Sequence, residues 1–168
     1  KPVLRARRNV DGTWSSSKLL PLPKFGDGMP TGVIEGGVLE ITDARGDAFG
    51  SLLGHRVVSL AAEGCTSEYT PRPEHMNPNG ILHGGALFAA MDSAQGALMH
   101  FVLEDDYAFA ATGTATIKYH RPVRTETLRI ATRVAGSERR KRFVRSEAFL
   151  PDGALVAELD EVWIAVPR

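Results

Sequence analysis

A single acidic side chain inside an apolar helical segment is the strongest candidate for chemistry in this chain. Residues 84–103 contain no proline and are dominated by Ala, Leu, Met and Phe, which predicts a helix buried on nearly all sides. Between Ala86 and Phe101 the only ionisable residues are Asp92 and His100. Because burying an unpartnered carboxylate is unfavourable, we interpret Asp92 as a general base or nucleophile. The alternative is that Asp92 lies on a thin polar stripe that faces solvent.

The segment before this helix has the composition of an anion-binding turn. Asn77-Pro-Asn-Gly-Ile-Leu-His-Gly-Gly85 leads directly into the apolar stretch. The first turn of a helix carries unpaired N–H groups and the positive end of the helix dipole. Gly84 and Gly85 have no side chain to keep a ligand away, so their N–H groups suit a developing oxyanion. The alternative is an ordinary glycine-rich turn.

Together these two features resemble a known family. The segment His75-Met-Asn-Pro-Asn-Gly-Ile-Leu-His-Gly-Gly-Ala-Leu-Phe-Ala-Ala-Met-Asp92 is similar to the motif of PaaI-like acyl-CoA thioesterases, which have the hotdog fold. The family pattern is Asn, two spacers, Gly, two spacers, His-Gly-Gly, and an Asp on the same helix. A later Tyr119-His-Arg-Pro122 resembles the family's strand-ending motif. The resemblance covers roughly residues 40–166.

The resemblance implies a role for each matching position. Asp92 matches the catalytic acidic residue, and Asn77 matches the residue that positions the thioester carbonyl or the water. Gly84 matches the N–H donor of the oxyanion hole, with His83 beside it. Thr112 lies where relatives place a Ser or Thr that helps to hold the water. The implied reaction hydrolyses an acyl-CoA to a free acid and coenzyme A, without a cofactor or metal.

Helix geometry predicts that two subunits share each site. Gly84 and Asp92 are eight residues apart, which is about 12 Å along one helix. One substrate carbonyl cannot easily meet both groups of a single chain, because a catalytic group must lie within about 3 Å of its target. Two helices packed antiparallel about a two-fold axis solve the problem. We therefore expect a homodimer or a dimer of dimers.

A basic cluster follows near the end of the chain. Arg139, Arg140, Lys141 and Arg142 lie at a predicted hairpin. Arginine side chains bind phosphate groups well, so these residues are candidates for contacts with the phosphates of coenzyme A. The alternative is a solvated turn, which charge runs usually are.

The order of elements predicts an α+β fold, in which an antiparallel sheet wraps around one long central helix. Strands are predicted at 56–62, 65–70, 112–119, 127–135, 142–150 and 154–166, and a weak helix at 39–53 with Asp43 as its N-cap. Residues 1–36, rich in Pro and Gly, are interpreted as an N-terminal extension, either wrapped on the domain or a floppy tail. Residues 37–168 are the hotdog domain.

Composition excludes several other classes of protein. Lys plus Arg and Asp plus Glu both number 20, giving zero net charge, which disfavours a nucleic-acid partner. The longest apolar run is too short to span a membrane. One cysteine, Cys65, fits a cytoplasmic location, and His75 and His83 do not have a zinc spacing.

A non-catalytic hotdog protein that binds an acyl ligand is the main alternative function. An enoyl hydratase on the same fold would need a His paired with an acid, and His100 lies beyond that place.

Overall fold

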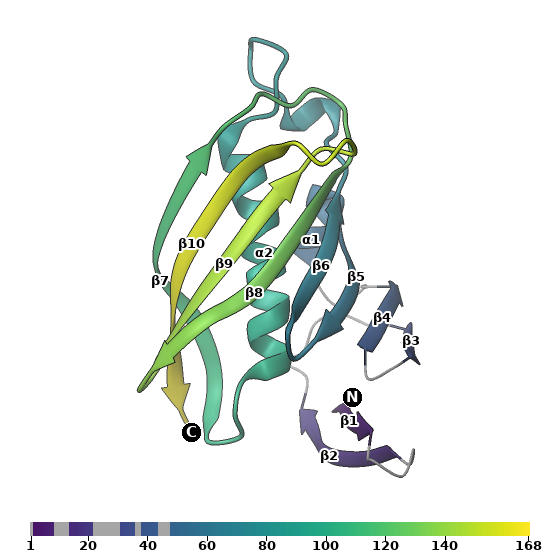
Figure 1. Cartoon of the computed structure of the whole chain (residues 1–168), viewed down its shortest axis with the longest axis vertical. Coiled ribbons are helices and arrows are strands. Elements are labelled where there is room, and N and C mark those ends of the chain that lie inside the picture. The colour runs from purple at the N-terminus through teal and green to yellow at the C-terminus, as the bar shows by residue number, and fades with distance from the viewer. Residues whose placement is uncertain (1, 9–13, 22–30, 36–37, 44–47) are drawn as a thin grey trace.

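Two helices, a short 3-10 turn and ten strands make up the described part of the chain (Figure 1). The computed structural model describes residues 2–8, 14–21, 31–35, 38–43 and 48–168. In chain order the elements are β1 (Pro2–Arg8), β2 (Trp14–Pro21), β3 (Thr31–Glu35), β4 (Val38–Asp43), α1 (Ala48–Leu53), β5 (His55–Ala61), β6 (Gly64–Tyr69), η1 (Pro73–His75), α2 (Gly84–Val102), β7 (Tyr107–Tyr119), β8 (Leu128–Glu138), β9 (Lys141–Phe149) and β10 (Leu155–Pro167).

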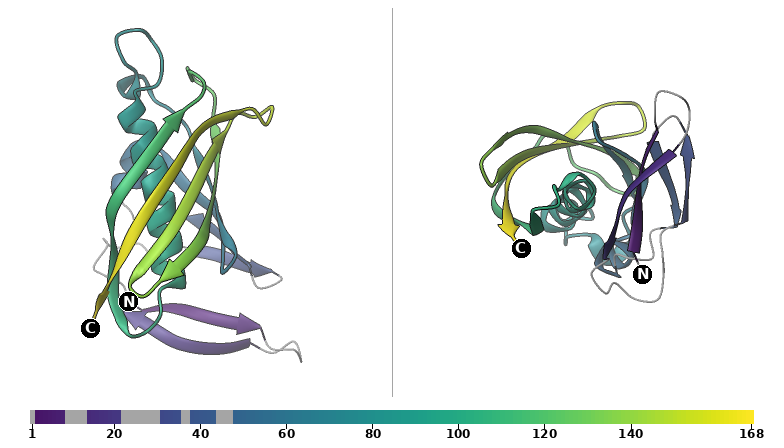
Figure 2. Two further views of the ribbon diagram at one scale, coloured as in Figure 1. Left: turned by 60° about the vertical axis from the view of Figure 1, so that its left-hand side comes forward. Right: turned by 90° about the horizontal axis from the view of Figure 1, so that it is seen from below.

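The main sheet has eight strands in the order β3-β4-β5-β6-β8-β9-β10-β7, and every neighbouring pair is antiparallel. The six strands from β5 to β7 curve around α2, as the view along the helix shows (Figure 2). β1 and β2 form a separate two-stranded antiparallel sheet. This is the predicted α+β arrangement of a sheet wrapped around one central helix.

The core fills the space between α2 and the inner face of the sheet. Leu87, Ala90, Met91, Leu98 and Met99 of the helix are all buried. The strands add side chains from alternate positions, because successive residues of a strand point to opposite faces. No helix in the described ranges is long and apolar enough to cross a membrane.

The strands and the helix after residue 55 lie where the sequence predicts them, within a few residues at each end. The predicted helix at 39–53 is wrong over its first part. Val38–Asp43 is strand β4, and α1 covers only Ala48–Leu53. Leu39 pairs with Leu60 of β5, so hydrogen bonding to a neighbouring strand prevails over a weak helical pattern. Asp43 ends β4 and is not a helix cap.

The first 36 residues include three of the described strands. β1 and β2 pair with each other, while β3 pairs with β4 and so adds to the edge of the main sheet. Part of the predicted extension, residues 9–13 and 22–30, lies outside the described residues.

Candidate active site

The loop before α2 is built by the side chain and backbone of Asn77. Its Oδ1 accepts hydrogen bonds from the backbone N–H groups of Asn79 at 2.9 Å and Ile81 at 3.4 Å. The backbone of Asn77 also pairs with Ile81 and Gly80, and Gly80 has the positive φ of 67° that such a turn favours. Since Oδ1 is fixed as an acceptor, the amide Nδ2 of Asn77 is left as a donor for a ligand.

The N-terminus of α2 presents one backbone donor beside this loop. His83 is the N-cap, and its Nδ1 accepts the N–H of Gly85 at 2.9 Å. A neutral His83 therefore carries its proton on Nε2. The Gly84 N–H, in contrast, bonds no other described residue. The Tyr119 hydroxyl donates to the Gly84 carbonyl at 2.8 Å, and a Cβ on Gly84 would lie 3.0 Å from that hydroxyl oxygen. A side chain at residue 84 would therefore crowd this contact.

Asp92 lies two turns further along α2 and is half-buried. Thr112 of β7 donates its hydroxyl to Asp92 Oδ1 at 3.0 Å. β7 and α2 run in opposite directions, so Tyr119 contacts the start of the helix and Thr112 its middle. The structure thus brings together two predicted site residues, Asp92 and Thr112, which are 20 positions apart in the sequence.

A pocket of about 380 Å³ lies beside Asn77 and Gly84. Its lining residues are Asn77, Ile81, Leu82, Gly84, Leu87, Tyr119, His120, Arg121, Pro122 and Val123. Asp92 does not line this pocket. Within one chain, therefore, the predicted site falls into two parts, with Asn77, His83 and Gly84 in one and Asp92 and Thr112 in the other.

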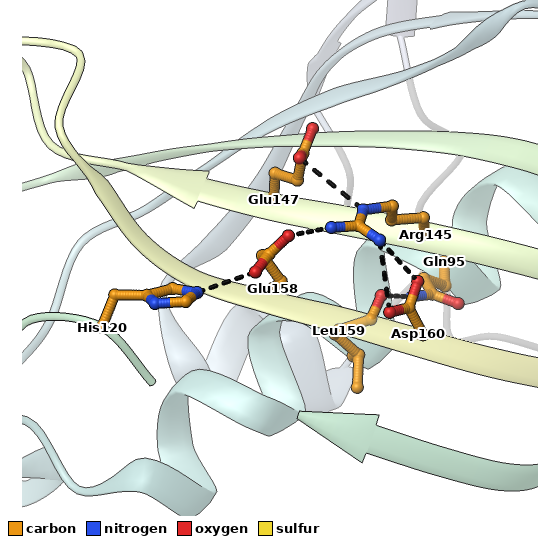
Figure 3. Close-up of polar contacts among 7 residues, drawn as sticks. All are labelled: Gln95, His120, Arg145, Glu147, Glu158, Leu159 and Asp160. Carbon is orange, nitrogen blue, oxygen red and sulfur yellow. Dashed lines mark hydrogen bonds and ion pairs between the residues drawn. The ribbon is translucent and has the colours of Figure 1, made fainter. Parts of the chain in front are cut away.

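One wall of the pocket is held by a cluster of charged side chains on the outer face of the sheet. Figure 3 shows Glu158 of β10 between two basic groups. Its carboxylate accepts a hydrogen bond from His120 at 2.8 Å and forms an ion pair with Arg145. Arg145 also contacts Glu147 at 3.6 Å and Asp160 at 3.3 Å. These contacts fix His120, the residue directly after Tyr119, at the pocket wall.

A second acid, Glu161 of β10, lies next to Asp92 and was not predicted from the sequence. Its side chain is buried, with 2% relative exposure. Burial, and secondly the negative charge of Asp92, raise the pKa of Glu161 from 4.5 to about 8. A signal exists in the sequence, because the inward positions of β10 are apolar at Leu159, Trp163 and Ala165 and acidic only at Glu161.

The predicted basic cluster divides into exposed and buried members. Arg139 and Arg140 are exposed in the turn between β8 and β9, and Lys141 is exposed at the start of β9. The side chain of Arg142 is only 9% exposed, and its Nη2 donates to both carboxylate oxygens of Glu104, at 2.9 and 2.7 Å. Its guanidinium is therefore already occupied. The turn lies at the end of the molecule opposite the loop that precedes α2 (Figures 1 and 2).

Comparisons with known proteins agree with this fold. The model of the Thioesterase superfamily matches residues 79–157, a segment that contains Gly84, Asp92 and Thr112. No curated protein matches the chain.

Similar solved structures include proteins connected with phenylacetate degradation. A putative thioesterase from Ralstonia eutropha JMP134, described as a phenylacetic acid degradation-related protein, is 28% identical with a TM-score of 0.64, over 70% of this chain and 89% of that one. The PaaI protein of the Escherichia coli phenylacetic acid degradation operon is 21% identical with a TM-score of 0.64, over 71% and 85%. The protein smu.793 from Streptococcus mutans UA159, solved with bound acetyl CoA, is 19% identical with a TM-score of 0.62, over 68% and 90%. The chain therefore has the hotdog fold, as predicted.

Proposed function

We propose that this chain is a PaaI-like acyl-CoA thioesterase, which hydrolyses a thioester to a free acid and coenzyme A. The match to the Thioesterase superfamily and the 28% identity to a putative thioesterase support this class of reaction. The relative that binds acetyl CoA supports the coenzyme. The observation that carries the proposal is that Thr112 holds the carboxylate of Asp92, on the same helix whose first N–H has no partner among the described residues.

The helix N-terminus stabilises the transition state in this proposal. The thioester carbonyl oxygen accepts the Gly84 N–H and the Asn77 amide, and it becomes an oxyanion when the carbonyl carbon is attacked. Donors placed in advance and aided by a helix dipole stabilise such a charge at little reorganisation cost. His83 contributes by holding the neighbouring Gly85 N–H, which fixes the geometry of the first turn.

Asp92 supplies the attacking group by one of two routes. As a base, it takes a proton from a water that Thr112 also contacts; the new C–O bond forms and the C–S bond then breaks. As a nucleophile, it forms an acyl anhydride that water hydrolyses in a second step. The thiolate leaves readily because a thiol has a pKa of about 8.5. A single turnover in ¹⁸O-water tests the nucleophile route: label in the Asp92 carboxyl would establish it, because that label arises only when water attacks the Asp92 carbon of the anhydride.

The division of the site within one chain supports a homodimer with shared sites. A partner whose α2 runs antiparallel would bring its Asp92 to this chain's pocket. β7 supports this arrangement because it pairs with only one described strand, β10, and almost all of its residues are exposed or half-exposed on both faces. In such a dimer the β8–β9 turn of one subunit lies toward the pocket of the other. We propose that Arg139, Arg140 and Lys141, rather than the occupied Arg142, contact the coenzyme phosphates.

A panel of short, medium and aryl acyl-CoA substrates tests the reaction through thiol release. D92N is expected to lower kcat by orders of magnitude while the variant still folds, as a cooperative urea unfolding transition would show. D106N, the same substitution at an exposed Asp, should leave kcat unchanged. Activity of D92N within twofold of wild type would remove Asp92 from the mechanism. Acyl-CoA binding without thiol release by the wild-type protein would instead indicate a non-catalytic binder.

Mixed dimers test whether the sites are shared. N77A and D92N are each expected to be inactive as homodimers. In a mixed dimer, one site combines the intact Asn77 of one protomer with the intact Asp92 of the other. An equal mixture should therefore regain about a quarter of wild-type activity, because half of the dimers are mixed and each has one good site. No recovery after subunit exchange would show that each site lies within one chain.

Charge reversal in the basic turn tests the coenzyme contact. R140E should raise KM for acyl-CoA and leave kcat unchanged. R133E, at an exposed arginine of β8 outside the turn, makes the same change in net charge and serves as the control. Equal KM values for the two variants would support the alternative, in which the basic turn faces solvent and does not contact coenzyme A.

A further inference from the structure

The buried Glu161 has one oxygen whose role is fixed by its surroundings. Oε2 accepts a hydrogen bond from the indole N–H of Trp163 at 2.9 Å. That N–H also donates to Gln95 Oε1 at 3.0 Å, and Gln95 Nε2 donates to the Leu159 carbonyl at 3.2 Å. Gln95 and Leu159 appear together in Figure 3. Oε2 therefore already serves as an acceptor, since an indole N–H only donates.

The other oxygen, Oε1, is buried and bonds no donor among the described residues. The charged neighbour of this carboxyl group is another acceptor, the Asp92 carboxylate. Two adjacent carboxylates in a poorly solvated place cannot both be ionised at low cost. A proton on Oε1 resolves the conflict, because it turns the unpartnered acceptor into a donor toward Asp92.

Among the described residues, no positively charged side chain lies against the Glu161 carboxyl to neutralise it. On α2, Asp92 is the charged group that faces Glu161. Across the sheet, Glu161 lies opposite Ala115 of β7 and Val144 of β9, neither of which titrates. The next inward residue of β9, Arg142, is paired with Glu104. The balance of charge therefore rests on the two carboxyl groups.

We propose that Glu161 is a positioning residue that carries a proton on Oε1 and shares it with Asp92. Asp92 then accepts one O–H from Thr112 and one from Glu161, so its carboxylate is held from two sides. The pKa of about 8 at Glu161 means that this proton is present at neutral pH and is lost in mildly alkaline solution. The effect on rate rests on the proposed thioesterase function, but the shared proton itself does not.

Loss of the proton is expected to harm the reaction. It removes a donor that orients Asp92, and it adds a second negative charge close to the place where an oxyanion develops. Like charges disfavour such a transition state. In wild-type protein, kcat should therefore fall as the pH rises through about 8, and this basic limb should depend on Glu161.

Two substitutions separate the proton from the shape of the side chain. In E161Q, the amide oxygen can accept the Trp163 N–H and the amide nitrogen can donate to Asp92, so the donor becomes permanent. We expect E161Q to keep kcat at pH 7 within about threefold of wild type and to lose the basic limb. E161A removes the donor, so kcat should fall about tenfold or more with KM unchanged. If E161Q loses as much activity as E161A, or keeps the wild-type limb, the proposal is wrong.

Carboxyl ¹³C NMR on the intact protein gives a readout that needs no activity. The Glu161 resonance, assigned by its absence in E161Q, should titrate near pH 8 in wild type and at lower pH in D92N, because the neighbouring charge is gone. Titration near the ordinary value of about 4.3 would overturn the proposal even in an active enzyme. A raised titration in a protein that hydrolyses no acyl-CoA would instead refute the thioesterase function and leave the shared proton standing.

Discussion

Substituting Glu161 by glutamine should change how the stability of the fold depends on pH. The folded chain raises the pKa of this carboxyl from 4.5 to about 8. Between these values the folded state keeps a proton that the unfolded state releases. Stability of the wild-type protein therefore falls as the pH rises through this window, because a proton bound only in the folded state favours folding at low pH. E161Q has no such proton, so its stability does not fall in this window for this reason.

The size of the effect follows from the same shift. One unit of pKa corresponds to about 1.36 kcal/mol. The wild-type free energy of unfolding is therefore lowered by at most about 5 kcal/mol above pH 8 and by about 3 kcal/mol at pH 7. Below pH 4.5 the carboxyl is protonated in both states and contributes no slope. The difference in unfolding free energy between E161Q and wild type should therefore grow steadily in favour of E161Q from pH 5 to pH 8.

Urea unfolding at fixed protein concentration and a series of pH values measures this difference. A fixed concentration matters because assembly contributes to the stability of an oligomer. E63Q is the matched control, since Glu63 is exposed in the turn between β5 and β6; its curve should run parallel to that of wild type. If the E161Q curve is also parallel, the carboxyl is not held neutral by the fold and the reasoning about the acid pair is refuted.

Three other outcomes follow from close packing and burial. G64A should destabilise the fold by about 1–3 kcal/mol, because the new Cβ would lie 2.5 Å from the Thr132 carbonyl oxygen. The control is G136A, whose new Cβ would have its nearest contact at 3.8 Å. It should change stability by less than about 0.5 kcal/mol in the same urea assay. Burial raises the pKa of the Cys65 thiol to about 12, so a disulfide reagent should label it only in denaturant, and rapid labelling of the folded protein would contradict its burial. R142A should lower the unfolding free energy by about 1–3 kcal/mol, because it removes an ion pair and two backbone contacts of a buried side chain; unchanged urea midpoints would show that the pair contributes nothing.

The sequence predicts the central helix and its neighbours well because their patterns are local. An apolar stretch without proline, such as 84–103, has few alternatives to a buried helix, and a turn such as Pro151-Asp-Gly153 separates two strands clearly. The segment at 39–53 is different, because its first residues suit either element. Pairing of Leu39 with Leu60, a contact 21 residues away, decides in favour of the strand and cannot be seen in a local window.

Apart from Thr112, which the family resemblance supplies, the candidate site is predicted only where its residues form a contiguous motif. Asn77, His83, Gly84 and Asp92 lie within 16 positions, and their spacing is informative by itself. Glu161 comes from a distant strand and meets Asp92 only because β10 and α2 pack together. Its place in the apolar phase of β10 marks it as unusual, but the identity of its neighbour is a property of the fold. The engagement of Arg142 by Glu104 is tertiary in the same way.

The exposed edge of strand β7 makes the newly synthesised chain prone to aggregation. The strand is 13 residues long, contains no proline, and carries one charged side chain, Lys118. A long edge strand with so few charges is a template on which other chains readily add, and natural proteins usually protect such edges. A chain whose β7 edge stays unpaired is therefore exposed to misassociation. If the proposed dimer covers this edge, variants that slow the pairing of two copies should give lower yield in the cell and more aggregate.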